Sequence, residues 1–375
     1  MEKDNLKLDD SSFNIKIEKN KKYFFNKNIK VLALYVIIIT LLIIIIKLKL
    51  KLNIINKSYF ECKNMETNYK KIIEINKEND NFWKQMLQLY IENRKEFYIR
   101  GREKIMKLNN RTYNDSNIKT IQDKYNWLTI HEFPEYKTKI VDKILLHEYS
   151  KKVLGKDICV PILKIYNNIE EFNLTELPEK FVLKFNHGCG MNILCNNKSN
   201  FNLSNAKILL NKWSKINYGL EGFEYQYLNV KKKFFAEKYL SDNINNYKIY
   251  CFNGKPKFIR VQKSLSTSTG NINNYYNLDW TLNDLETNLP HYIRKPEIVF
   301  KKPKNIKLMI KYAKKLSKEF AFVRVDLYEI KNLVYLGELT FTPFNALVNY
   351  KNKFQSLWLS KLLDITKIKN FSISQ

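Results

Sequence analysis

The chain has 375 residues, of which 45% are hydrophobic, and this is enough for a large hydrophobic core with more than one lobe. A formal net charge of +28 could indicate a nucleic-acid partner or an anionic membrane. The lysines are spread along the whole chain, however, and no zinc-finger or RNA-recognition motif accompanies them. We therefore interpret the charge as a solvated surface and do not expect nucleic acid as a partner. The five cysteines and four histidines show neither disulfide nor metal-ligand spacing.

The N-terminal part contains a polar tail and a candidate membrane span. Residues 1–28 are basic, polar and free of glycine, so we expect them to be disordered. Residues 31–46 carry no charge and are bracketed by Lys30 and Lys47, which predicts a transmembrane helix over residues 29–50. The long tail before this run favours an uncleaved, single-pass anchor over a signal peptide; the alternative is a buried core helix. Six lysines precede the span within twenty residues and five follow it, so neither orientation is favoured.

The region after the span is expected to begin with helices. Residues 51–117 are predicted to form a stem or linker, with helical character from Tyr59 to Leu108. Residues 118–375 are expected to form one catalytic domain. Within it, Lys139–Leu154 has the pattern of an amphipathic helix that ends at Gly155.

Strand patterns become frequent after residue 180. Phe181–Phe185 and Met191–Cys195 are predicted to be strands that flank a glycine-containing loop. Ser204 is expected to cap a helix that runs to about Ile216. Because strands outnumber helices from here on, we expect an α+β fold.

Two further strand pairs follow in the C-terminal part. A hairpin is predicted around Asn253–Gly254, which is a strong turn signal between two strand-like runs. A helix is expected from about Asn305 to Lys318. The last pair of strands is predicted on either side of a polar turn, residues 329–332.

This last pair carries two acids and an arginine. Asp326 and Glu338 would lie on neighbouring strands, with Arg324 two residues before the first acid. Two carboxylates beside an arginine can form a site for Mg²⁺ and a polyphosphate. Simple strand alternation would place Glu338 on one face with Leu336 and Thr340. The alternative is that both acids are exposed residues of a sheet.

A second candidate site surrounds the glycine-containing loop. Lys184 ends a strand just before His187-Gly188-Cys189-Gly190. Backbone N–H groups of such a loop can bind phosphate oxygens, and a lysine beside it supplies positive charge. The loop is no Walker A motif, because no helix begins with Gly-Lys-Ser/Thr. The alternative is an ordinary hairpin loop, and we interpret Cys189 with His187 as part of the loop rather than as a nucleophile pair.

Together these motifs occur in the order found in ATP-grasp ligases. Residues 177–184, 247–255 and 322–328 resemble most closely the TupA-like ATP-grasp family, which is linked to teichuronopeptide and other surface-polymer synthesis. The resemblance extends from about Asp142 to Pro343. It implies an ATP-grasp fold, in which two α+β lobes hold ATP between them.

The resemblance also implies residue roles. Arg324 and Lys184 would be catalytic, and Asp326 and Glu338 would bind Mg²⁺. The residues expected to contact ATP are Lys143, Lys184, His187, Gly188, Gly190, Glu237, Lys238, Leu240 and Lys248. At Thr340 asparagine is frequent in the superfamily, although the TupA-like group tolerates threonine. The chain also has His147 in place of an expected arginine and Cys189 in place of serine.

The function implied is that of a membrane-anchored ligase that depends on ATP and Mg²⁺. It would join a carboxylate to an amine through an acyl phosphate, in surface polysaccharide or glycoconjugate synthesis, on an acidic sugar or an amino-acid-bearing glycan. Three alternatives stay open at this point. They are a kinase-like enzyme, a glycosyltransferase-type enzyme acting on a glycan, and a non-catalytic nucleotide-binding scaffold.

Overall fold

The computed structural model describes residues 44–46, 49, 80–132, 134–242, 244–264, 271–289 and 292–368. The chain divides into two compact units, residues 1–77 and 78–375. In the first unit only residues 44–46 and 49 are described, and they are helical and exposed. The predicted tail, the remainder of the predicted span and residues 51–77 of the predicted stem therefore lie outside the described residues. Within the described ranges, no helix has both the length and the apolar character needed to cross a bilayer.

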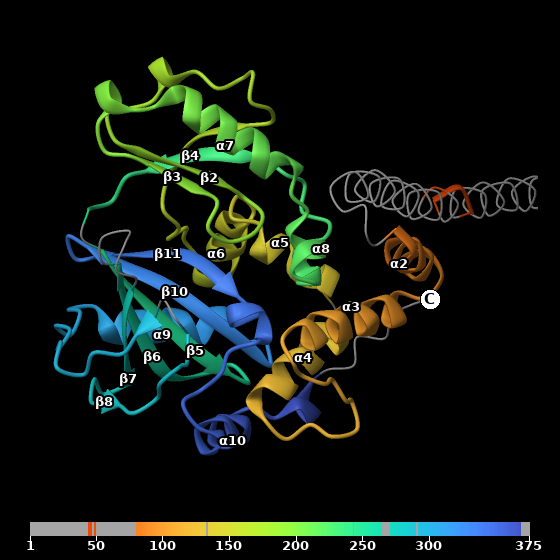
Figure 1. Cartoon of the computed structure of the whole chain (residues 1–375). Helices are drawn as coiled ribbons and strands as arrows, with labels where there is room; N and C mark the ends of the chain where they lie inside the picture. Colours follow the sequence, from red (N-terminus) through yellow and green to blue (C-terminus); the bar gives the residue numbers. More distant parts are fainter. Residues whose placement is uncertain are drawn as a thin grey trace, which may run out of the picture. The chain divides into compact units, whose positions relative to one another are not determined.

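The second unit is built on two sheets with helices around them (Figure 1), and their strands pair antiparallel with one exception in the larger sheet. The smaller sheet has the strand order β1-β4-β2-β3. Its strands are β1 (Ile162–Tyr166), β2 (Phe181–Phe185), β3 (Asn192–Cys195) and β4 (Phe234–Lys238). Helix α7 (Leu203–Lys215) covers this sheet, and Leu210 packs into its aromatic core with Phe181 and Phe234.

The larger sheet has the strand order β11-β10-β5-β6-β7-β8, and β9 pairs with β7 in parallel. Its strands are β5 (Asn245–Phe252), β6 (Lys255–Ser264), β7 (Asn271–Asn277), β8 (Leu282–Asn283), β9 (Tyr292–Ile293), β10 (Phe322–Ile330) and β11 (Leu333–Thr340). The predicted strand pairs are thus confirmed, and the fold belongs to the predicted α+β class.

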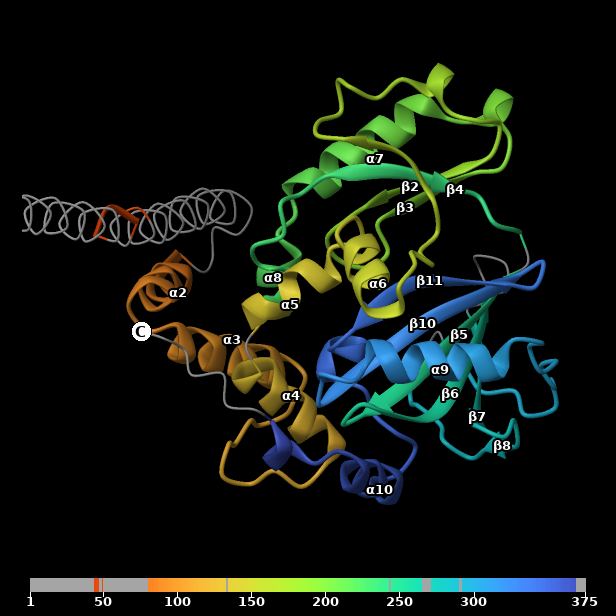
Figure 2. The same cartoon turned by 180° about the vertical axis from the view of Figure 1, so that it is seen from behind.

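Helices cover both faces of the larger sheet. On one face lies α9 (Ile306–Leu316), seen in front of the sheet in Figure 2, whose Met309 and Leu316 are fully buried. The other face is covered by α4 (Ile121–His131) and α10 (Lys353–Leu362). Apolar residues alternate along β10 and β5 toward the α9 face, while polar residues of the same strands point to the opposite face.

Two-residue turns connect the strands of both predicted hairpins. Asn253 and Gly254 have φ angles of 45° and 73°, and Lys331 and Asn332 have φ angles of 49° and 62°. Positive φ at both central residues gives a turn whose twist matches that of the flanking strands. The hairpin around Asn253–Gly254 is confirmed. The turn predicted over residues 329–332 consists only of the last two of these residues, Lys331 and Asn332.

Two helix predictions were wrong in detail. The predicted helix Lys139–Leu154 is two helices, α5 (Pro134–Val141) and α6 (Leu146–Leu154), although it does end at Gly155, which has φ 77°. The interruption occurs because Oδ1 of Asp142 accepts from the backbone N–H groups of Ile144 and Leu145, at 2.8 and 3.3 Å. Helix α7 is capped by Asn202 rather than by Ser204, since the Asn202 side chain accepts from the N–H of Asn205.

The described part of the predicted stem, residues 80–117, is helical up to Leu108 and packs against the rest of the second unit. It forms α2 (Asp80–Glu92) and α3 (Arg94–Leu108). Arg102 of α3 is fully buried, and it donates to the Asn126 side chain in α4 and to the Asn345 side chain and backbone. Asn345 belongs to η4 (Pro343–Ala346), the 3₁₀ turn that follows β11.

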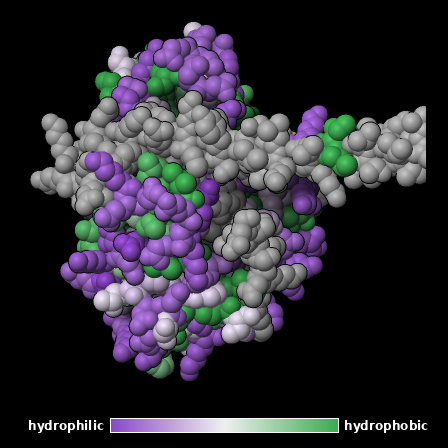
Figure 3. All heavy atoms as spheres, turned by 90° about the vertical axis from the view of Figure 1, so that its right-hand side faces the viewer, coloured by the Kyte–Doolittle hydropathy of each residue, from purple (hydrophilic) through white to green (hydrophobic). Residues whose placement is uncertain are grey.

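On the face shown in Figure 3, most described residues are hydrophilic, consistent with a charged, solvated surface.

Candidate active site

The predicted acidic pair is formed by strands β10 and β11. Asp326 lies directly opposite Glu338, and Arg324 lies opposite Thr340. The register shifts between Asp326 and Leu327, so the simple alternation assumed from sequence fails at this bulge. Leu336 consequently packs in the core on the α9 side, not on the face of Glu338 as predicted.

Arg324 binds both acids. Its Nε donates to Oδ1 of Asp326 at 2.6 Å, and its Nη2 donates to Oδ2 at 2.8 Å. The same Nη2 lies 3.0 Å from Oε1 of Glu338 and 3.0 Å from Oγ1 of Thr340. The Thr340 hydroxyl in turn donates to Oε1 of Glu338 at 3.1 Å. Threonine in place of the frequent asparagine therefore still connects the acid to the arginine.

Lys248 of β5 completes this cluster. It lies opposite Asp326 in the sheet, and its Nζ forms a short ion pair with Oδ2 of Asp326. Burial alone would raise the pKa of Asp326, which is 0% exposed, but the charges of Arg324 and Lys248 outweigh burial and hold the pKa well below its usual range. Burial lowers the pKa of Lys248 to about 8 despite the facing carboxylate. Asp326 is therefore ionised over the physiological range.

The smaller sheet contributes a second ion pair. Lys184 of β2 contacts Glu237 of β4, whose strand partner is Val182. These two side chains are 23% and 11% exposed, compared with 0–8% for Asp326, Arg324 and Lys248. Lys238 is exposed, its N–H donates to the carbonyl of Pro161 at 2.9 Å, and Leu240 is half-buried beyond the strand end.

The glycine-containing loop is fastened to the turn between α5 and α6. Nζ of Lys143 donates to the carbonyl of Gly188 at 2.5 Å, and the Lys143 N–H donates to the carbonyl of Asn186 at 3.2 Å. Gly188 and Gly190 have φ angles of 83° and 75°, which other residues adopt only with strain. A Cβ at Gly188 would lie 2.6 Å from the ring of Tyr218, whereas one at Gly190 would meet open space.

The histidine of this loop is placed inside the lobe. His187 is buried and packs edge-on against the ring of Phe185. Burial, with the nearby charges of Lys232 and Lys143, lowers the pKa of His187 to about 3, so the ring is neutral. Any contact of this segment with phosphate therefore has to come from the loop backbone and from the lysines.

The two lobes meet at the loop and at β11. The N–H of Leu336 in β11 donates to the carbonyl of Ile158, in the segment before β1, at 2.7 Å, and Glu338 is among the charges that act on the Cys189 thiol of the loop. The charge of Glu237 likewise acts on Tyr328 of β10. Arg324, Asp326, Glu338 and Lys248 thus form one cluster, and Lys143, Lys184 and Glu237 belong to the other lobe. The roles of these residues in binding ATP and Mg²⁺ stay predictions.

Sequence reasoning missed Glu224, which lies between α8 (Tyr218–Glu221) and η3 (Tyr225–Tyr227). This carboxylate is buried and accepts a short hydrogen bond from the hydroxyl of Thr342, just after β11. Gln226 also donates to Thr342, at 2.7 Å. Burial raises the pKa of Glu224 to about 7. No motif surrounds Glu224 in the sequence, so only its position in the fold reveals it.

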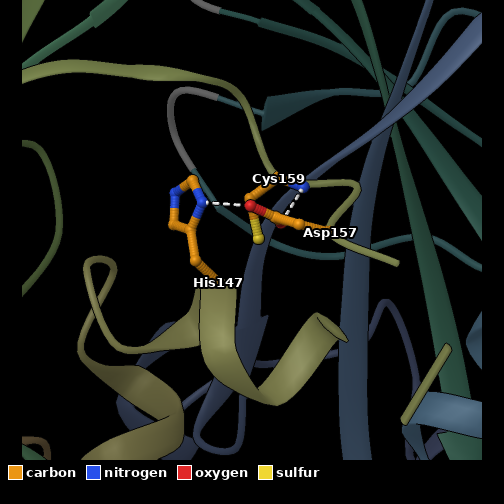
Figure 4. A group of neighbouring side chains, drawn as sticks. All are labelled: His147, Asp157 and Cys159. Atoms are coloured by element: carbon orange, nitrogen blue, oxygen red, sulfur yellow. Dashed lines mark hydrogen bonds and ion pairs between the residues drawn. The ribbon is translucent and has the colours of Figure 1, made fainter. Parts of the chain in front are cut away.

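A histidine, an aspartate and a cysteine also meet beside α6 (Figure 4). Nδ1 of His147 lies 2.6 Å from Oδ2 of Asp157, and Oδ1 of Asp157 accepts from the N–H of Cys159 at 2.9 Å. Their ligand atoms lie within 4.8 Å of one another, a proximity that their spacing in the sequence did not predict. These hydrogen bonds connect α6 to the segment that leads to β1, and this connection is enough to explain why the three side chains lie together.

The acids suit a hard divalent cation. Mg²⁺ prefers carboxylate oxygens and is commonly bound by one or two carboxylates together with substrate phosphates. Within the described residues, the hydrogen bonds of Glu338 use only Oε1, and its side chain is 29% exposed. Both oxygens of Asp326 already accept from Arg324 and Lys248. Glu338 is therefore the more accessible ligand for the cation. The oxygens of Asp326 would bind the cation while they still accept from Arg324 and Lys248.

Comparison with known proteins gives the following matches. The sequence model of a family described as TupA-like ATPgrasp matches residues 119–363. A comparison with curated proteins found no match.

Several solved structures resemble the chain. D-alanine–D-alanine ligase from Bacillus anthracis complexed with ATP is 18% identical, with a TM-score of 0.31 over 54% of this chain and 54% of that chain. L-amino acid ligase from Bacillus licheniformis is 11% identical, with a TM-score of 0.33 over 53% and 42%. N5-carboxyaminoimidazole synthetase from Staphylococcus aureus complexed with ADP is 15% identical, with a TM-score of 0.30 over 54% and 44%. The chain spans about half the length of these proteins.

Proposed function

Because the chain belongs to the TupA-like ATP-grasp family, we propose that it joins a carboxylate to an amine with the use of ATP. The family match covers more than half of the chain and confirms the resemblance inferred from its sequence. The chain is therefore an ATP-grasp enzyme, of the class that contains carboxylate–amine ligases, and its cofactors are ATP and Mg²⁺.

The observation that carries the proposal is the cluster around Asp326. Asp326 and Glu338 lie on adjacent strands, and one arginine, Arg324, binds both carboxylates. A lysine, Lys248, forms an ion pair with Asp326. Asp326 and Glu338 would hold Mg²⁺, which neutralises the charge of the phosphates when it is bound. The same arrangement suits a phosphoryl-transfer site, where catalysis consists mainly of positioning and charge stabilisation.

In the proposed reaction, an oxygen of the substrate carboxylate attacks the γ-phosphorus of ATP, and the bond to the β,γ-bridging oxygen breaks. ADP leaves and an acyl phosphate remains. The nitrogen of an amine then attacks the acyl carbon, and inorganic phosphate departs with the electron pair of the broken C–O bond. The nitrogen releases a proton to the departing phosphate or to solvent. No oxidation state changes in either step.

The residues of the two lobes have different tasks in this reaction. Lys184, Lys143 and the backbone of the loop from Gly188 to Gly190 hold the phosphates. Glu237, Lys238 and Leu240 contact the adenine at the end of β4. Arg324 stabilises the negative charge on the transferred group; its hydrogen bonds use Nε and Nη2, which leaves Nη1 for a substrate oxygen.

The proposal includes a membrane anchor and a surface-glycan substrate. The uncharged run of residues 31–46 supports an anchor over residues 29–50. The likeness to a family linked to surface polymers supports an acidic sugar or an amino-acid-bearing glycan as the substrate. The catalytic domain, residues 118–375, would act on that substrate at the membrane.

Trapping with hydroxylamine tests the reaction class. Full-length protein is incubated with Mg–ATP, hydroxylamine and candidate carboxylates such as glucuronate and glutamate. A ligase gives ADP and a hydroxamate in equal amounts, because hydroxylamine takes the place of the amine. Formation of ADP together with a phosphorylated hydroxyl compound, and without hydroxamate, would show a kinase-like reaction and overturn the proposal. Glu338→Gln is the control for ATP use by this site.

A further inference from the structure

A buried arginine in the larger sheet lacks acceptors for its donors. Arg260 of β6 is 2% exposed, and its Nε and Nη1 have no hydrogen-bond partner in the part of the chain that the structure describes. The hydroxyl of Tyr275, its neighbour on β7, is also buried, and the polar groups beside it include Arg260 itself and Thr287. Burying polar donors without acceptors is costly, and for a charged group it is more so. Such a pair of donors indicates a missing anionic or polar partner.

Two aromatic rings cover Arg260 but do not satisfy it. The guanidinium carbon lies 4.8 Å from the ring centroid of Phe344 and 5.5 Å from that of Tyr292. Cation–π contacts stabilise a guanidinium over its flat faces. Its N–H groups lie in the plane and point outward from the edge, where a planar carboxylate or a phosphate can accept two of them. The edge is the part that still needs an acceptor.

Arg260 belongs to the same row as the acidic pair. Reading across the sheet, Glu338 faces Asp326, Asp326 faces Lys248, Lys248 faces Arg260, and Arg260 faces Tyr275. Neighbouring strands are about 4.8 Å apart, so the backbone of Arg260 lies about 10 Å along this row from that of Asp326. Arg260 is therefore next to the proposed reaction centre, on the far side of Lys248 from the two acids.

The other buried arginines show how this chain stabilises such groups. Arg102 donates to side-chain and backbone oxygens of Asn126 and Asn345, and Arg324 binds Asp326 and Glu338. All three nitrogens of Arg102, and Nε and Nη2 of Arg324, donate to groups of the protein itself. At Arg260 the protein supplies the rings and leaves the edge unpaired, which is the pattern of a ligand site rather than of a structural residue.

The backbone beside Arg260 is also unusual. Phe344, Asn345 and Ala346 follow β11 with φ angles of 55°, 55° and 58°, although none is glycine. Three consecutive left-handed residues are strained, and such strain concentrates at active sites and ligand clamps. Phe344 covers Arg260 from this turn.

We propose that Arg260 binds a second oxyanion of the substrate, a carboxylate or phosphate that does not itself react. The anion accepts from the edge of the guanidinium and from the Tyr275 hydroxyl, and the ring of Phe344 or Tyr292 moves aside to admit it. The inference rests on the proposed ligase function, because the anion is located relative to the reaction centre at Asp326 and Glu338. Arg260 lies on the next strand after Lys248, on the side away from the two acids. Such binding restricts one of the two substrates, the carboxylate or the amine, to compounds that carry an acidic group in addition to the reacting group.

Malonate serves as the probe, since the substrate is not identified. Full-length protein is saturated with Mg–ATP, so that the phosphate site is filled, and malonate is titrated at constant ionic strength while thermal unfolding is followed. Arg260→Met is expected to weaken malonate binding about tenfold to a hundredfold, which corresponds to the loss of charge-assisted hydrogen bonds. Its unfolding temperature without malonate should not fall below that of the wild type. Arg260→Lys keeps the positive charge but not the paired N–H donors of the guanidinium. Its malonate affinity is expected to lie between that of the wild type and that of Arg260→Met.

Lys314→Met is the matched control, because it removes one positive charge from the exposed face of α9. Equal malonate binding by Arg260→Met and Lys314→Met would overturn the proposal. If Arg260→Met does not fold, the same comparison is made with Arg260→Lys. The ATP-grasp assignment fails separately, through the absence of any stabilisation of the wild type by Mg–ATP.

The two sources of the anion are separated by the two half-reactions. Hydroxamate formation requires ATP, the carboxylate substrate and hydroxylamine, whereas complete ligation requires the natural amine instead of hydroxylamine. A rise in KM for the carboxylate in Arg260→Lys assigns the anion to the donor. A rise in KM for the amine alone assigns it to the acceptor. An unchanged KM for both would contradict a role in substrate binding.

Discussion

In the larger sheet Asp326 is enclosed by two buried cations, whereas in the smaller sheet Lys184 and Glu237 form an ion pair whose lysine is partly exposed. Asp326 is 0% exposed and is held by Arg324 and Lys248. Lys184 and Glu237 form a single ion pair with exposures of 23% and 11%. The two halves thus carry similar residue types in different environments.

This difference indicates different contributions of the two halves. A buried, mutually bound cluster is rigid and keeps its charges oriented before any ligand arrives, which is how electrostatic stabilisation of a transition state is achieved. The same burial makes the cluster sensitive to the loss of one member. A partly exposed ion pair contributes little to stability, and its residues are free to exchange partners when a nucleotide binds.

The largest effect is expected from breaking the buried half. Asp326→Ala leaves Arg324 and Lys248 buried without their shared carboxylate, and it should lower the free energy of unfolding by about 3–5 kcal/mol. The measurement is urea unfolding followed by circular dichroism. Glu338→Ala is the matched control, since Glu338 is 29% exposed and should cost about 1 kcal/mol or less. Equal losses in the two variants would contradict the comparison.

A pH effect is expected from Glu224, which connects the lobes through Thr342. Burial raises its folded pKa from 4.5 to about 7. The folded state therefore binds more protons than the unfolded state between these values, and stability is present below pH 4.5 and is lost as the pH rises through 7. Each pKa unit corresponds to about 1.4 kcal/mol, so the loss is on the order of 3 kcal/mol.

Glu224→Gln removes this titration while keeping an acceptor for the Thr342 hydroxyl. The variant should be more stable than the wild type at pH 8, and the difference should disappear below pH 4.5. Chemical unfolding at several pH values measures it. A stability that falls between pH 4.5 and 7 by the same amount in the wild type and in Glu224→Gln would assign the dependence to other groups.

A smaller effect distinguishes the two glycines of the loop. Alanine at either position adopts a left-handed φ at a cost of about 1–2 kcal/mol. Only Gly188→Ala also meets the ring of Tyr218, at 2.6 Å, so it should lose about 1–3 kcal/mol more than Gly190→Ala. Thermal unfolding of the two variants provides the test. A larger loss in Gly190→Ala would show that the loop is not packed on Tyr218.

The sequence predicts those parts of the fold that depend on local pattern. Alternating residues give β2, and the Asn253–Gly254 pair gives the hairpin of β5 and β6, because turn geometry follows from residues that accept positive φ. The acidic pair is likewise predictable as two residues on adjacent strands. The bulge after Asp326 is not, and it reverses the face of Leu336.

Other features depend on contacts between distant parts of the chain. Strand β7 reads as polar, yet Asn274 is fully buried, because its amide donates to the carbonyls of Lys295 and Ile298 and accepts from the Lys295 N–H. Arg260 and Glu224 follow no motif and acquire their environments only from the packing of other elements. A sequence pattern cannot reveal such residues, since their partners are brought to them by the tertiary fold.

The most direct test of the ATP-grasp site is thermal unfolding of the full-length protein with and without Mg–ATP. Nucleotide at about a hundredfold over its Kd should add about 2.7 kcal/mol of stability. Lys184→Ala and Glu338→Gln are suited to this test, because both residues are partly exposed and their loss should leave the protein folded. We expect Mg–ATP to stabilise the wild type and to stabilise neither variant. Stabilisation that persists in both variants, or none in the wild type, would contradict this expectation.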